Sequence, residues 1–140
     1  MTIEIFHRNR DETLNRALTL WLCRIAAIAM FGLGLLYWVR LVGVFDGELW
    51  RFDLMPVPWR MVAPMLAVLY PIAGVGLWMA VSWGAVVWAI VALVEATIAF
   101  GMPETFGGDP RIAAGHGIGL ALLAILRAIA WFEARRRNRV

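Results

Sequence analysis

Lysine is absent from this 140-residue chain, while serine and cysteine each occur once and histidine twice. A single cysteine, Cys23, excludes an intramolecular disulfide and a cysteine-based metal site. Two histidines are too few for a histidine-rich metal site or a bis-histidine haem within one bundle, because His7 lies in the N-terminal tail. Ser82, the one serine, falls on the opposite side of the predicted topology from His116. The sequence therefore favours a protein without enzymatic activity and predicts neither a metal nor a cofactor.

Charged residues are also scarce, at 16% of the chain, whereas 62% of the residues are hydrophobic and the mean hydropathy is +0.75. A soluble domain is about half apolar and a quarter charged. A chain this short leaves much of its surface exposed, so the excess apolar residues cannot all be buried. These values exclude a water-soluble monomer, a disordered chain and a nucleic-acid-binding protein with a basic surface. They predict a small integral membrane protein whose first partner is the lipid bilayer.

Three uncharged stretches locate the membrane spans, and the middle one, at 34 residues, is too long for a single crossing. Ser82-Trp83-Gly84 divides it, with Ser82 expected as a helix N-cap and Gly84 as a flexible point. Asp109-Pro110 is typical of an N-cap followed by the first helical residue. We therefore predict an all-α, polytopic four-helix bundle forming one domain over residues 1–140. Its expected spans are residues 17–44, 61–81, 83–102 and 112–132.

The arginines predict the orientation of the bundle. Seven lie near the chain ends and four near the two connections of the opposite side. Because positive charge favours the cytoplasmic side, both termini are expected in the cytoplasm. The C-terminal arginines are predicted to act as a stop-transfer anchor, with binding of anionic lipid as the alternative. They are Arg135, Arg136, Arg137 and Arg139.

Ionisable residues within membrane spans are expensive and often functional, and three of them are expected in the same half of the bilayer. Glu95 lies well inside the third span, His116 one turn into the fourth, and Arg40 near the outer end of the first. A cluster of these three side chains could handle protons or ions, or bind a polar ligand. Alternatively, it could serve only as a polar clamp between helices.

Small residues form one face of the last span, where they would allow close approach of another helix. We expect this face to pack within the chain rather than against a second copy. Its members are Ala113, Gly117, Ala121, Ala124 and Ala128.

Residues 41–58, which read LVGVFDGELWRFDLMPVP, resemble a family of small four-helix inner-membrane proteins from alphaproteobacteria. The resemblance continues through Ser82-Trp83-Gly84, Glu95 and residues 103–107. It implies a multi-pass protein of the bacterial inner membrane and brings no known function. A weaker likeness in hydrophobic layout, around residues 73–77, is to DoxX-like membrane proteins, which are associated with quinone-linked roles.

Three functions are compatible with these observations. The first is a non-enzymatic accessory subunit that binds a membrane-protein partner, or a second copy, through its small-residue faces. The second is a small oligomeric transporter or proton-coupled component that uses Glu95 with His116 or Arg40. The third is a quinone-linked protein of the DoxX-like kind, since a quinone or lipid pocket needs no fixed motif.

Overall fold

The computed structural model describes the backbone of residues 2–137 and the side chains of residues 14–136. Within this range the chain is all-helical, as predicted. Four helices are long and apolar enough to cross a membrane, in the segments Leu14–Val42, Val57–Trp78, Ser82–Gly101 and Pro110–Arg136. The elements in chain order are α1 (Thr2–Val42), α2 (Val57–Trp78), α3 (Ser82–Ala96), the π-helical turn η1 (Thr97–Gly101), α4 (Pro103–Phe106) and α5 (Pro110–Arg137).

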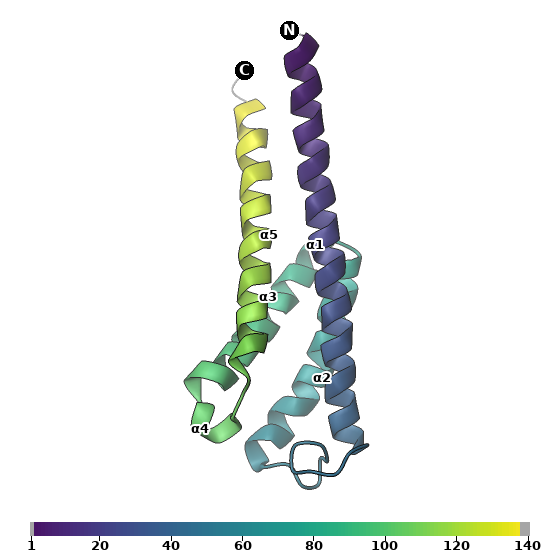
Figure 1. The fold of residues 1–140 in the computed structure, drawn as a ribbon, viewed down its shortest axis with the longest axis vertical. Helices are drawn as coiled ribbons and strands as arrows, with labels where there is room; N and C mark the ends of the chain where they lie inside the picture. The colour runs from purple at the N-terminus through teal and green to yellow at the C-terminus, as the bar shows by residue number, and fades with distance from the viewer. Residues whose placement is uncertain (1, 138–140) are drawn as a thin grey trace.

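Helices α1 and α5 run in opposite directions and bring the two ends of the described chain to the same end of the bundle (Figure 1). Both extend beyond the turn that joins α2 to α3. The connection after α1 and the short helix α4 lie at the other end (Figure 1). Helix α1 begins at Thr2, well before the expected start near residue 17. The first glycine of the chain is Gly32 and the first proline Pro56, so no helix breaker interrupts the N-terminal segment.

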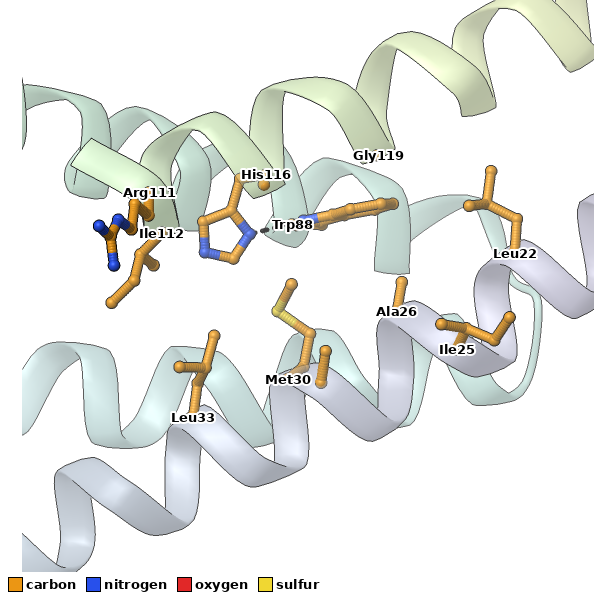
Figure 2. Close-up of a pocket in the computed structure, with 12 residues that line it drawn as sticks. Leu22, Ile25, Ala26, Met30, Leu33, Trp88, Arg111, Ile112, His116 and Gly119 are labelled. Carbon is orange, nitrogen blue, oxygen red and sulfur yellow. Dashed lines mark hydrogen bonds between the residues drawn. The ribbon is translucent and has the colours of Figure 1, made fainter. Parts of the chain in front are cut away.

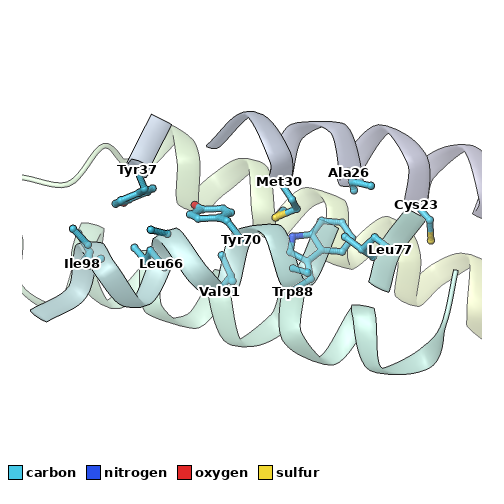
Figure 3. Close-up of a cluster of buried hydrophobic side chains, with 14 of the residues drawn as sticks. Cys23, Ala26, Met30, Tyr37, Leu66, Tyr70, Leu77, Trp88, Val91 and Ile98 are labelled. Atoms are coloured by element: carbon cyan, nitrogen blue, oxygen red, sulfur yellow. The ribbon is translucent and has the colours of Figure 1, made fainter. Parts of the chain in front are cut away.

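The core is a narrow column of side chains along the axis of the bundle (Figure 3). Tyr70, Leu66, Leu77 and Val91 are its largest fully buried helical residues. The outside of the bundle is apolar as well: Ile25, Leu35, Trp21, Leu93 and Phe132, among others, are each at least 59% exposed. A bundle that is apolar inside and outside fits a lipid environment and not water.

The turn between α2 and α3 falls immediately before Ser82, but its residues act differently from the prediction. The N-cap of α3 is Val81, without a side-chain cap, and Ala80 provides the left-handed residue of the turn at φ +54°. Gly84 is buried in the helix, where a Cβ atom would lie 2.3 Å from the carbonyl carbon of Gly76. Gly84 is therefore required for close approach of α2 and α3 rather than for flexibility.

Helix α5 begins as predicted, because the Asp109 carboxylate accepts a hydrogen bond from the Arg111 amide at 2.9 Å and Pro110 is the first helical residue. Its small-residue face does not pack within the chain as expected. Of that face only Ala113 is buried, whereas Gly117, Ala121, Ala124 and Ala128 are exposed. The prediction of intramolecular packing is wrong here because α5 turns its Ala113, His116 and Leu123 side inward.

Candidate functional site

Glu95 projects from α3 into the centre of the bundle and is 4% exposed. Its Oε1 atom accepts two hydrogen bonds, from the hydroxyl of Tyr37 on α1 at 3.0 Å and from that of Tyr70 on α2 at 2.7 Å. These are the two tyrosines of the whole sequence, and their rings stack with centroids 5.5 Å apart. The buried carboxyl group of Glu95 is thus hydrogen-bonded from two neighbouring helices, as a polar group in an apolar interior requires.

The network continues from Tyr70 to α5. The Tyr70 hydroxyl lies 3.1 Å from Nε2 of His116, and the indole Nε1–H of Trp88, on α3, donates to Nδ1 of His116 at 3.1 Å. His116 and Trp88 are 4% and 2% exposed. Side chains from α1, α2, α3 and α5 therefore meet in a single chain of hydrogen bonds, which we call the tyrosine–glutamate–histidine network (Tyr37, Tyr70, Trp88, Glu95 and His116).

The direction of each hydrogen bond in this network follows from the donors available. An indole N–H can only donate, so Nδ1 of His116 must accept and carries no proton. In a neutral imidazole the proton is then on Nε2, which donates to the Tyr70 oxygen, and the single hydroxyl proton of Tyr70 goes to Glu95. Protonation of Nδ1 would place two N–H donors face to face. Trp88 therefore holds His116 in one neutral tautomer.

Arg40, the third residue of the predicted cluster, lies beside the network without joining it. Its guanidinium carbon is 5.3 Å from the ring centroid of Tyr37 and 5.1 Å from that of Trp50. The structure contains two ion pairs among the residues that it describes, and Arg51 forms both of them. Arg40 and Glu95 therefore do not form an ion pair. The structure thus links Glu95 to His116 through Tyr70, whereas Arg40 stacks between two aromatic rings.

Tyr37, Tyr70 and Trp88 were not among the residues singled out from the sequence. One signal was available in the sequence. Tryptophans favour the two membrane interfaces, and in the predicted arrangement of four spans Trp88 is the tryptophan that lies at depth. A tryptophan at that depth needs an acceptor for its N–H, and a buried tyrosine hydroxyl needs a partner. Listing acceptors at a similar depth would have connected these residues to Glu95 and His116.

A cavity of about 320 Å³ opens beside the network, between α1, α3 and α5 (Figure 2). His116 and Trp88 form part of its wall, and Arg111 lies at one end. The remaining lining is apolar or glycine: Leu22, Ile25, Ala26, Ala29, Met30, Leu33, Ile112, Gly115 and Gly119. This lateral cavity therefore combines an apolar length with polar groups concentrated toward one end.

The connection between α1 and α2 carries its own exposed charges. Arg51 donates to Asp53 with its terminal nitrogen at 2.8 Å and lies 3.7 Å from Asp46. The hydrogen bond from Arg51 lowers the pKa of the Asp53 carboxyl below its ordinary value. Across the described residues, no three His, Cys, Asp or Glu side chains are grouped as a metal site would require. This connection pairs its charges instead, as the mixture of acidic residues and arginine suggests.

The C-terminal arginines are only partly described. Arg135 stacks over the Trp131 ring at 4.0 Å, and Arg136 is exposed. Arg137 ends α5, but its side chain is outside the described set, and Arg139 lies outside the described residues altogether.

Residues 17–134 match a family model, and this range includes α2, α3, most of the apolar segments of α1 and α5, and every member of the network. The chain belongs to DUF6163. This is a family of unknown function, in agreement with the resemblance drawn from residues 41–58. No curated protein and no solved structure matches the chain. The alphaproteobacterial origin and the likeness to DoxX-like proteins remain predictions.

Proposed function

We propose that this DUF6163 protein binds one lipid-soluble molecule in the lateral cavity, in the bacterial inner membrane and with both termini in the cytoplasm. The observation that carries the proposal is the cavity between α1, α3 and α5, whose volume of about 320 Å³ is at the small end of ligand pockets. Such pockets are mostly apolar with a few polar groups that fix orientation. Arg111 is such a group here.

The chemistry of the lining defines the ligand class. Both ring nitrogens of His116 are engaged by Trp88 and Tyr70, so His116 offers the cavity its ring edge, whereas Arg111 offers hydrogen-bond donors. A molecule with an apolar body and one acceptor or anionic group at its end fits this arrangement. A quinone and a fatty acyl chain with a carboxylate both meet that description, and identification of the bound molecule distinguishes them.

Two glycines of α5 provide a matched test. Gly115 lines the cavity and Gly117 faces outward, and a Cβ atom at either position meets nothing within 4 Å. Gly115→Leu should fill the cavity without disturbing the fold, and Gly117→Leu is the control. After purification in mild detergent, solvent extraction and mass spectrometry should find one lipophilic compound retained by the wild type and the control. We expect roughly tenfold less in Gly115→Leu; equal retention in both variants would contradict the proposal.

A second candidate is the accessory role, in which the protein binds a partner helix. It is supported by the exposed small-residue face of α5 at Gly117, Ala121, Ala124 and Ala128. Helix α5 is also the least covered, with 17% of its apolar segment buried against 44% for α2. For this role Gly117→Leu is the test variant and Gly115→Leu is the control. Gly117→Leu should abolish the binding of a co-purifying partner or the formation of a homo-oligomer, and Gly115→Leu should not. An assembly state unaffected by Gly117→Leu would argue against this role.

A proton-coupled role for Glu95 has less support. Glu95 does not line the lateral cavity, and Trp88 occupies the His116 nitrogen that an incoming proton would need. Glu95→Gln separates the alternatives, because a clamp loses stability, whereas a proton-handling site loses proton flux in vesicles while the protein stays folded. Proton flux that is measured with the wild type and is lost in a folded Glu95→Gln variant would support the proton-coupled role.

A further inference from the structure

A second cavity, of about 360 Å³, lies between α1 and α5. Its lining residues on these helices belong to the parts nearest the chain ends, which lie at the same end of the bundle (Figure 1). Ala80, in the turn between α2 and α3, closes it on one side. Arg16, Arg127 and Glu133 line it, and charged side chains favour the membrane–water boundary, so we place the cavity level with one membrane surface. We call it the terminal cavity; it shares no lining residue with the lateral cavity.

The polar lining of the terminal cavity contains both acceptors and cations. The Asn15 amide donates through Nδ2 to the Leu126 carbonyl at 3.2 Å, which fixes Oδ1 as the other amide atom. That Oδ1 has no hydrogen-bond partner among the described residues, and because it is buried it is not accessible from the cavity. Glu133 adds a carboxylate, and Arg16 and Arg127 add two guanidinium groups. Neither arginine forms an ion pair with a side chain in residues 14–136.

This set of groups is complementary to a ligand that carries a cationic N–H donor and an anion a short distance apart. An ammonium group has three donors and would form a charge-assisted hydrogen bond with the Glu133 carboxylate. A phosphate is bound well by guanidinium groups, which match its geometry. Leu20 and Leu126, which also line the cavity, would contact the apolar chains that follow such a headgroup.

We propose that the terminal cavity binds the headgroup of a phosphoethanolamine lipid of the adjacent leaflet. The ammonium lies at Glu133, and the phosphate at Arg16 and Arg127. This assignment is independent of the ligand in the lateral cavity. It predicts discrimination by the amine, because a choline headgroup differs only by methyl groups that remove every N–H donor, and a glycerol headgroup has no amine.

The test uses the full-length protein in vesicles that contain equal parts of phosphatidylethanolamine, phosphatidylcholine and phosphatidylglycerol. After extraction in mild detergent, mass spectrometry measures the lipid that stays bound. We expect phosphatidylethanolamine to be enriched roughly tenfold over the other two, as one charge-assisted hydrogen bond implies. Equal enrichment of ethanolamine and choline lipids would overturn the proposal, as would preference for the glycerol lipid.

Variants connect the selectivity to the cavity. Glu133→Gln and Arg127→Gln replace partly or fully exposed charges and should fold normally, which circular dichroism can check. Each should remove most of the ethanolamine enrichment, whereas Arg136→Gln, an exposed arginine outside the cavity, should keep it. Enrichment that survives both cavity variants would overturn the assignment. Displacement of the lipid by an equal concentration of free phosphoethanolamine would assign the site to a soluble ligand instead.

Discussion

Removal of the Tyr70 hydroxyl should destabilise the bundle more than removal of the Tyr37 hydroxyl, although both donate to the same Glu95 oxygen. Tyr70 is fully buried and makes two hydrogen bonds, one to Glu95 at 2.7 Å and one with His116 at 3.1 Å. In Tyr70→Phe, the Nε2–H of His116 therefore loses its partner. In Tyr37→Phe, Oε1 of Glu95 still accepts the hydrogen bond from Tyr70.

The expected magnitudes follow from this count. A buried donor without a partner costs about 1–3 kcal/mol, and an ordinary hydrogen bond about 0.5–1.5 kcal/mol. Tyr70→Phe should therefore lower the free energy of unfolding by about 2–4 kcal/mol, and Tyr37→Phe by about 0.5–1.5 kcal/mol. Hydrogen bonds between membrane helices average about 0.6 kcal/mol, so the loss in Tyr37→Phe should lie near the low end of its range.

Reversible unfolding in mixed micelles, followed by circular dichroism, measures both variants under identical conditions. A double variant that also carries Trp88→Phe adds a check. Loss of the Trp88 indole leaves Nδ1 of His116 without a hydrogen bond, so the imidazole is free to reorient its N–H toward another acceptor. The loss of unfolding free energy caused by Tyr70→Phe should then be smaller than in the presence of Trp88. Equal losses for Tyr70→Phe and Tyr37→Phe, or strict additivity with Trp88→Phe, would refute the shared-hydroxyl arrangement.

Three further predictions concern packing, capping and pH. Gly84→Ala should lower the free energy of unfolding by about 1–3 kcal/mol, because its Cβ atom would meet backbone atoms of α2. Gly117→Ala, which has open space around it, should raise the free energy of unfolding by about 0.5–1 kcal/mol. Similar values for the two variants in micelle unfolding would contradict the close approach of α2 and α3. Asp109→Ala should lower stability by about 1 kcal/mol through loss of the α5 N-cap, and Asp109→Asn should restore most of it in the same assay. Arg51 lowers the pKa of Asp53 in the folded protein, so their pairing stabilises the fold at pH values above the ordinary carboxyl pKa of about 4. This stabilisation is lost as the pH falls through the lowered pKa of Asp53. The melting temperature should therefore fall less steeply with acid in Asp53→Asn than in the wild type, and an equal pH dependence in both would exclude this contribution.

The helices were predictable because span length and the cost of exposed backbone in lipid leave few options for long apolar runs. Glu95 and His116 were also identifiable, since an ionisable side chain in a span must find a partner. The partners themselves were not. The helices are apolar on nearly every side, so periodicity does not indicate which side faces inward. The same ambiguity explains the outward small-residue face at Gly117 and Ala121.

The tyrosine–glutamate–histidine network joins α5, the least buried of the four long helices, to the rest of the bundle. Helix α5 buries little of its surface, and the lateral cavity separates part of it from α1. His116 connects α5 to α2 through Tyr70 and to α3 through Trp88. The Trp88 ring also fits against Gly119, where a Cβ atom would come within 2.6 Å of it. His116 and Trp88, which hold α5 in place, are therefore also part of the cavity wall, so substitution of either should change the volume of the lateral cavity.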